Sequence, residues 1–232
     1  MGYVRLKHTL SALALEALEH PDRRVVVGWL VTYCNLIKAG ADGRGFWQPL
    51  SALNVRGGSA LLDAFGPAEG LFDLTDDGVA LRAEFRSHFA YMDRQTHRLQ
   101  AALRTLRVGS RAGPRAADRI QMRKAAALFN HGLFFECHEF LEDVWRAAPA
   151  AERGFYHGVI LIAAAFYHHE KGNLHGTRVK LKQGVAYLQP YLPRAHGVRL
   201  DRWVQALAPW RERVNAGRIT GVIAHNEIPR IP

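Results

Sequence analysis

The chain has few of the features that mark secreted and membrane proteins. Its 232 residues include only two cysteines, Cys34 and Cys137, which lack CxxC spacing. The sequence therefore predicts two buried, reduced thiols, not a disulfide framework or a zinc cage. The longest uncharged apolar run, Gly158 to Tyr167, is about half of the roughly 20 residues that a helix needs to span a bilayer. No contact with a membrane is expected.

The beginning of the sequence also lacks the basic end and apolar block of a signal peptide. Lys7, Glu16 and Glu19 stand there within an amphipathic pattern. Together with the reduced thiols, this pattern predicts a cytoplasmic protein. The chain contains neither a Gly-rich phosphate loop nor a Ser/His/Asp grouping that stands out, so a non-catalytic role is favoured over an enzymatic one.

Acidic residues are scarce in one short stretch. Residues 94–124 hold nine Lys and Arg against one Asp, whereas residues 1–93 hold 9 against 11 Asp and Glu, and residues 125–232 hold 13 against 9. Most of the net charge of +10 thus belongs to residues 94–124, the basic segment. Its cations are Arg94, Arg98, Arg104, Arg107, Arg111, Arg115, Arg119, Arg123 and Lys124. A run of this kind binds phosphates with release of counterions, so nucleic acid is the expected partner. A solvated basic helix is the alternative.

Residues 1–84 show helical periodicity followed by alternation. The pattern predicts helices over 6–18 and 22–39, the second capped by Asp22 and ended by Gly40, short helical turns over 46–54 and 58–66, and a hairpin around Asp77-Gly78. This order of elements resembles winged-helix modules of DNA-binding proteins. However, the expected recognition turn, Ser59 to Phe65, has no cation, and the expected wing tip is Asp76-Asp77. Direct DNA reading, contact with a protein and a structural role all remain open for this domain.

A helix is expected over residues 84–106, and glycines and a proline then break the periodicity near 108–117. The long helix could link two domains or pair with a second chain as a homodimer. We therefore predict a mainly α protein with a winged-helix-like domain (1–84), a basic connecting helix and linker (85–117) and a C-terminal helical bundle (118–232). The bundle helices are expected at 118–145 with a break at 130–132, at 152–171, at 174–188, and from residue 200 with an interruption near Pro209.

The stretch "FNHGLFFECHEFLEDVW", residues 129–145, carries a dense group of polar residues among aromatic ones. With the second helix of the bundle it gives the motif cluster: Asn130, Glu136, His138, Glu139, Glu142, Trp145, His168 and Asn173. Their order over residues 120–190 closely resembles the family called domain of unknown function 309. The resemblance implies an all-α fold and no settled activity. Family members usually have glutamine where this chain has His157 and Leu161, so any function of those glutamines is altered here.

On a helix, His138 and Glu142 lie four residues apart and share a face, which is a spacing that can hold a metal ion. The candidate ligands for a divalent metal are Glu136, His138, Glu142 and His168. The alternative is a structural network, in which these groups bond to one another, to Asn130 or to Asn173 inside a closed apolar core. Apart from the divalent metal of the first interpretation, no cofactor is expected. His131, His169 and His175 are expected at exposed helix ends.

Three functions follow from these features. The first is non-catalytic nucleic-acid binding through the basic segment and the winged-helix-like domain. The second is a metal-dependent or acid/base enzyme centred on His138 and Glu142. The third is a protein-interaction scaffold. The basic segment favours the first of these three functions.

Overall fold

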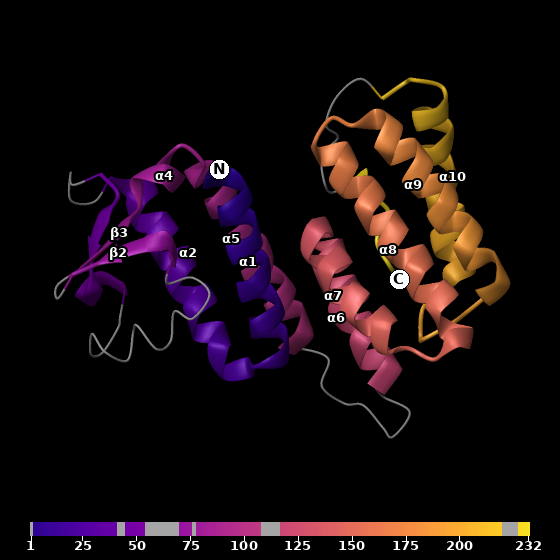
Figure 1. Cartoon of the computed structure of the whole chain (residues 1–232), viewed down its shortest axis with the longest axis horizontal. Coiled ribbons are helices and arrows are strands. Elements are labelled where there is room, and N and C mark those ends of the chain that lie inside the picture. Colours follow the sequence, from indigo (N-terminus) through magenta and orange to yellow (C-terminus); the bar gives the residue numbers. More distant parts are fainter. Residues whose placement is uncertain (1, 41–44, 54–69, 76–77, 108–116, 220–226) are drawn as a thin grey trace. The chain divides into compact units, whose positions relative to one another are not determined.

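The computed structural model describes the chain except for residues 1, 41–44, 54–69, 76–77, 108–116 and 220–226. The chain divides into two compact units, Met1–Arg104 and Thr105–Pro232, and each is described by itself (Figure 1). The prediction of a mainly helical protein is confirmed. None of the described helices is both long enough and apolar enough to cross a membrane.

The first unit combines helices with a small sheet. Its elements are α1 (Gly2–Glu19), the 3-10 helix η1 (Pro21–Arg23), α2 (Arg24–Ala39), β1 (Trp47–Pro49), the 3-10 helix η2 (Leu50–Leu53), β2 (Phe72–Leu74), β3 (Gly78–Leu81), α4 (Ala83–Arg86) and most of α5 (Phe89–Arg107). Gly40 ends α2 as predicted, with a left-handed φ of 62°. Asp22 is not the cap that the sequence suggested, because it lies within η1 and α2 begins two residues later without a side-chain cap.

The sheet has the order β1-β3-β2, and both pairings are antiparallel. The predicted hairpin is confirmed by β2 and β3, although its tip at Asp76-Asp77 lies outside the described residues. The helical turn expected over residues 46–54 is wrong in its first half. Trp47 and Gln48 instead pair with β3, and the Trp47 indole covers the backbone of Gly78, where a Cβ would lie 2.4 Å from the ring.

The winged-helix arrangement stays a prediction, because the expected recognition turn, Ser59 to Phe65, also lies outside the described residues. The long helix expected over 84–106 is in fact two helices, α4 and α5, with a turn at residues 87–88. Both predicted free thiols are confirmed and buried, and burial raises the pKa of Cys34 to about 12.

The second unit is a bundle of antiparallel helices. It contains α6 (Ala117–Asn130), α7 (Phe134–Ala147), α8 (Ala150–Glu170), α9 (Leu174–Leu188), the 3-10 helix η4 (Gln189–Tyr191) and α10 (Leu200–Asn215). In Figure 1, α8 and α9 run side by side, and α7 packs on the other flank of α8. The Phe129 ring meets Phe134, Phe166 and Trp203 edge to face, and all four side chains are buried. Aromatic burial of this extent makes these rings the centre of the core.

Glycines set two of the helix ends as the sequence predicted. Gly132 follows α6 with φ of 76°, and Gly172 follows α8 with φ of 70°. By contrast, the interruption expected near Pro209 is wrong, because α10 continues through this proline. Pro209 and Gln205 are exposed, so water can satisfy the carbonyl that loses its N–H partner. The buried side chains of Trp203, Leu207 and Trp210 hold both halves of the helix against the core.

Two glycines allow α8 and α9 to touch through their backbones. A Cβ on Gly158 would lie 2.8 Å from the Leu188 side chain, and a Cβ on Gly184 would lie 2.8 Å from the carbonyl oxygen of Gly158. The close approach of these helices brings the side chains on their outer faces together. Those side chains include part of the motif cluster.

Candidate functional site

The basic segment begins on α5 in the first unit. Arg94 and Arg104 are exposed there, and Arg98 is half-buried. Arg107 is the last residue of α5, and its side chain lies outside the described part of the chain, as do Arg111 and Arg115 entirely.

On α6 in the second unit, Arg119 is exposed, while Arg123 and Lys124 are half-buried. Lys124 lies 6.0 Å from the centre of the Phe140 ring. Each unit thus carries cations of the basic segment on its own surface. We name the described cations on both helices the α5–α6 cations: Arg94, Arg98, Arg104, Arg119, Arg123 and Lys124.

Four of the α5–α6 cations have no carboxylate partner among the described side chains: Arg94, Arg104, Arg119 and Arg123. Two other cations of the first unit are each paired with a carboxylate. The Arg5 guanidinium lies 2.8 Å from Glu84, and the Lys38 ammonium lies 2.9 Å from Asp93. The positive charge of the four arginines is therefore not neutralised within the described chain.

Aromatic side chains lie next to the first of these cations, a feature that the sequence analysis did not identify. The Tyr3 ring meets Tyr91 edge-on at 5.1 Å and His88 at 5.7 Å, and all three are half-buried. The Arg94 guanidinium lies over the Tyr91 ring at 5.7 Å. We name Tyr3, His88 and Tyr91 the aromatic group. Rings beside arginines are the elements on which unpaired bases stack in single-strand-binding proteins.

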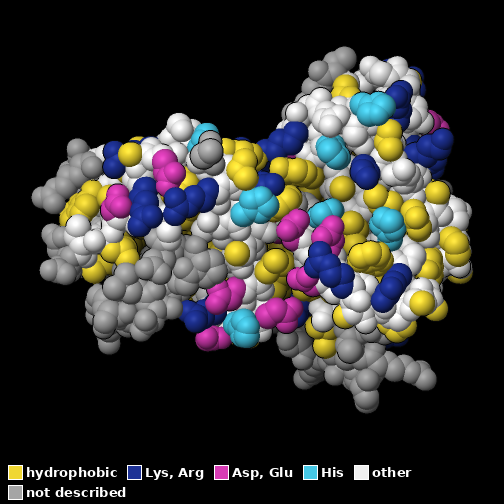
Figure 2. Space-filling view, viewed as in Figure 1, with side chains coloured by type: hydrophobic (Ala, Val, Ile, Leu, Met, Phe, Trp, Pro, Cys, Tyr) yellow, Lys and Arg dark blue, Asp and Glu magenta, His cyan; other side chains and the backbone are white. Residues whose placement is uncertain are grey.

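The motif cluster lies mainly on the outer face of the bundle, where imidazoles, carboxylates and cations intermingle over α7, α8 and α9 (Figure 2). His138 Nδ1 lies 3.2 Å from Glu139 Oε1, and its Nε2 lies 3.3 Å from Glu142 Oε1. Arg146 lies 2.9 Å from the other oxygen of Glu142. The His138 side chain is 27% exposed and both glutamates are 35% exposed. The expected contact between His138 and its acids is present, but it lies at the surface and not in a closed core.

Glu136 does not join these groups. It is only 1% exposed, next to the buried Cys137, whose pKa is raised by burial and by the charge of Glu136. The proposed set of Glu136, His138, Glu142 and His168 is therefore divided between the interior and the surface. Among the described residues, no group of three or more His, Cys, Asp or Glu is arranged to hold a metal ion.

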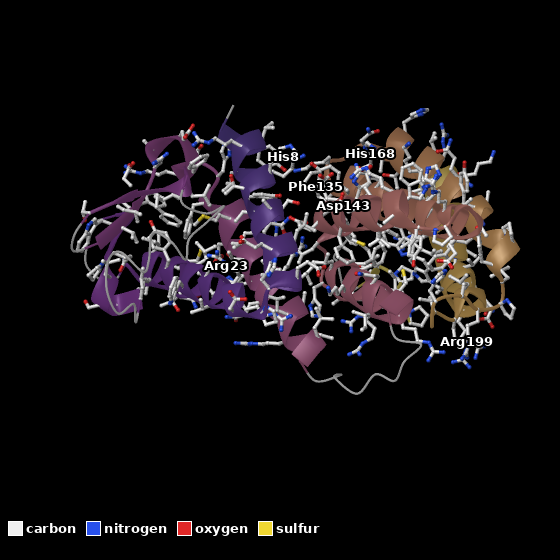
Figure 3. All side chains as sticks on the ribbon, turned by 60° about the horizontal axis from the view of Figure 1, so that its bottom comes forward. His8, Arg23, Phe135, Asp143, His168 and Arg199 are labelled. Atoms are coloured by element: carbon white, nitrogen blue, oxygen red, sulfur yellow. The ribbon has the colours of Figure 1, made fainter. Side chains whose placement is uncertain are left out.

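His168 on α8 is held by the turn that precedes α9. Asn173 caps α9 by accepting a hydrogen bond from the Gly176 N–H at 2.8 Å, and its amide nitrogen lies 3.2 Å from His168 Nδ1. Gly176 leaves room for this contact, because a Cβ there would lie 2.8 Å from the imidazole. Figure 3 shows His168 on the same side of the bundle as Phe135 and Asp143 of α7, away from Arg199.

His157, one of the two departures from the family pattern, also lies on this face. Its ring is 4.4 Å from Tyr187 of α9 and 6.0 Å from Trp145 of α7. The pKa of His157 is lowered by partial burial and then by Lys180, and the same two causes come first for His168, followed by His138. Lys180, on α9, is a site residue that the sequence analysis missed, because it is not one of the residues of the motif cluster.

We predict that Lys180→Gln raises the pKa of both His157 and His168 toward the ordinary histidine value of about 6.5. A histidine whose pKa is lowered in the folded state makes the fold less stable as the pH falls below its unfolded value. Lys180→Gln should therefore weaken the loss of stability between about pH 7 and pH 5. The measurement is a proton NMR titration of the imidazole C–H resonances. Lys182→Gln, an exposed neighbour on α9, is the control; equal shifts in both variants would contradict the role of Lys180.

Asn130 and His169 have roles that differ from the expected ones. Asn130 does not contact the His138 group, because both of its amide atoms bond to the backbone of Ile231, at 2.8 and 2.9 Å. His169, expected at an exposed helix end, is 1% exposed and packs edge-on against Trp210 at 5.4 Å. Burial lowers its pKa.

Comparison with known proteins agrees with the motif. Residues 122–179 match the family model described as domain of unknown function (DUF309). The chain contains a DUF309 domain. The uncharacterized protein YpuF of Bacillus subtilis (strain 168) is 39% identical over 57 residues, which are 24% of this chain and 33% of YpuF. The chain thus covers about a third of the length of this relative. No solved structure matches the chain.

The DUF309 domain, as matched, spans α7 and α8 and parts of α6 and α9. It therefore includes the whole motif cluster. It does not include the aromatic group, α5 or α10.

Proposed function

We propose that the protein is a non-catalytic nucleic-acid-binding protein that uses the basic segment. The observation that carries the proposal is that four arginines of the basic segment have charges that no described carboxylate neutralises: Arg94 and Arg104 in the first unit, and Arg119 and Arg123 in the second. Phosphate groups are abundant anions that would complement these charges. Each phosphate contact releases condensed counterions, so the binding is strong in dilute salt and largely independent of sequence.

The aromatic group favours single strands over duplexes. In a duplex the bases are stacked on one another and their faces are closed to protein side chains, whereas a single strand offers its bases for stacking. Tyr91 carries the Arg94 guanidinium on its ring and contacts Gln95, whose amide also bonds to Arg98 at 3.4 Å. Base stacking and phosphate contacts would thus come from the same turn of α5.

The test is a titration of the full chain with fluorescein-labelled single-stranded and duplex oligonucleotides at two salt concentrations. The proposal predicts saturable binding of both in dilute salt, tighter binding of the single strand, and a large loss of affinity as salt rises. An absence of binding to either oligonucleotide in dilute salt would remove the proposal.

Tyr91→Ala is predicted to weaken single-strand binding about tenfold, which is toward the lower end of the stacking energy of one base. Duplex binding should change by less than about twofold, because the variant keeps every cation. The measurement is fluorescence anisotropy with both oligonucleotides. Tyr187→Ala on α9, a half-exposed tyrosine of the bundle, is the matched control. Equal loss for the single strand and the duplex would argue against stacking on Tyr91.

A further inference from the structure

The last described residues of the chain, Glu227–Pro232, lie against the helical bundle of the second unit. We name them the docked segment. Ile228 and Ile231 are 6% and 3% exposed, whereas Glu227, Arg230 and Pro232 are exposed. The docked segment therefore buries two aliphatic side chains, three residues apart, and leaves its charged side chains in water.

Three side chains of the bundle hold the backbone of the docked segment, and we name them the clamp: Asn130, Trp203 and Trp210. Asn130 donates from Nδ2 to the carbonyl of Ile231 at 2.9 Å and accepts from the N–H of the same residue at 2.8 Å. The Trp203 and Trp210 indole N–H groups donate to the carbonyls of Pro229 and Glu227, at 3.3 and 3.1 Å. The clamp thus forms hydrogen bonds with the backbone of every second residue of the docked segment.

The two indoles of the clamp are held by ring contacts within the core. The Trp203 ring packs edge-on against Phe129, and the Trp210 ring packs against Phe166 and His169. Both indoles are buried, so an indole N–H without a carbonyl acceptor would lose a hydrogen bond in an apolar environment. Groups held in this way favour the binding of a segment that offers carbonyls at the same spacing.

Recognition through backbone atoms does not depend on the identity of the bound side chains. The only side chains that a bound segment must supply are aliphatic ones at the positions of residues 228 and 231. Moreover, Asn130 lies within the matched residues 122–179, whereas the docked segment lies outside them. Asn130, which makes two of the four hydrogen bonds between the clamp and the docked segment, therefore belongs to the DUF309 domain. The docked segment does not belong to this domain.

We propose that the clamp is a peptide-binding site and that the docked segment is its intramolecular occupant. The partner it fits is a linear segment of another protein with aliphatic side chains at two positions three residues apart and with free backbone carbonyls at the positions equivalent to 227, 229 and 231. Such a partner binds by displacing residues 227–232. This site is independent of nucleic-acid binding, since none of the clamp residues belongs to the basic segment.

The test uses the full chain and a fluorescein-labelled peptide with the sequence of residues 226–232. In the wild type the docked segment is tethered to the clamp, so its effective concentration there is high. The labelled peptide must compete with it and is therefore expected to bind weakly. Replacing both aliphatic residues in the chain, Ile228→Asp with Ile231→Asp, should raise the affinity for the peptide at least tenfold. Adding Asn130→Ala to that chain should reverse the gain, and a peptide with both isoleucines replaced by aspartate is the control that should not bind.

Ile231→Ala, a milder change, is a second variant in case the double variant does not fold, and it should give a smaller gain in affinity. Circular dichroism establishes which variants are folded. A folded variant that binds the peptide no better than the wild type would overturn the proposal. Unfolding of both variants would also overturn it, because the docked segment would then be an indispensable part of the core. A dimer in light scattering that the peptide dissociates would identify the occupant as a second copy of this chain, again against the proposal.

Discussion

Replacement of Arg94, Arg104, Arg119 and Arg123 by glutamine is expected to lower the affinity for a single-stranded oligonucleotide by a factor on the order of 10²–10³ at about 0.1 M salt. These four arginines have no described carboxylate partner, so their loss leaves no acidic group unpaired. The size of the effect follows from counterion release, which contributes a salt exponent of about 0.7 for each phosphate contact on a single strand. The measurement is fluorescence anisotropy at constant salt.

A control variant separates location from net charge. Lys182, Arg202, Arg211 and Arg218 lie outside the basic segment, and their replacement by glutamine removes the same charge of four. This control should retain affinity within about tenfold, because distant cations contribute only through the screened field of the protein. Equal losses in the two variants would mean that the overall charge, and not the basic segment, attracts nucleic acid.

Gly184→Ala is expected to lower the free energy of unfolding of the second unit by about 1–3 kcal/mol, as overpacking of a close contact does. The added Cβ would lie 2.8 Å from the Gly158 carbonyl oxygen and 3.0 Å from the Ile162 nitrogen, and neither backbone atom can move without separating α8 from α9. The overpacking therefore outweighs the higher helix propensity of alanine, which alone would stabilise the helix by about 1 kcal/mol relative to glycine. Denaturant unfolding followed by circular dichroism measures the change.

The exposed neighbour Gln183 provides the control for this substitution. Gln183→Ala should change the stability by less than about 0.5 kcal/mol. If Gly184→Ala were as stable as Gln183→Ala, the two helices would not be in backbone contact.

The sequence predicted those parts of the fold that depend on neighbouring residues. Gly40 and Gly172 end helices because glycine adopts positive φ readily, and this preference is visible without any tertiary contact. The break after Asn130 has the same origin at Gly132, whereas the end of the helix over 174–188 is marked by Pro190. The prediction failed where distant residues decide the outcome. Trp47 and Gln48 form a strand because β3 pairs with them, and Pro209 is accommodated because core contacts hold α10 on both sides of it.

The candidate site shows the same limit. The four-residue spacing of His138 and Glu142 correctly places them together on one helix face, but it does not say whether that face is buried. The face is half-exposed, whereas Glu136, two residues before His138, is buried. Asn130 and Ile231 are 101 residues apart, and no periodic pattern connects them. The winged-helix arrangement and the homodimer stay predictions.

The salt dependence of binding tests the central claim most directly. The logarithm of the single-strand binding constant is measured against the logarithm of salt concentration for the wild type and for the variant that lacks Arg94, Arg104, Arg119 and Arg123. If the basic segment makes the phosphate contacts, the slope of the variant should be shallower than that of the wild type by about 3, close to 0.7 for each lost cation. Parallel lines for the two proteins would contradict the account.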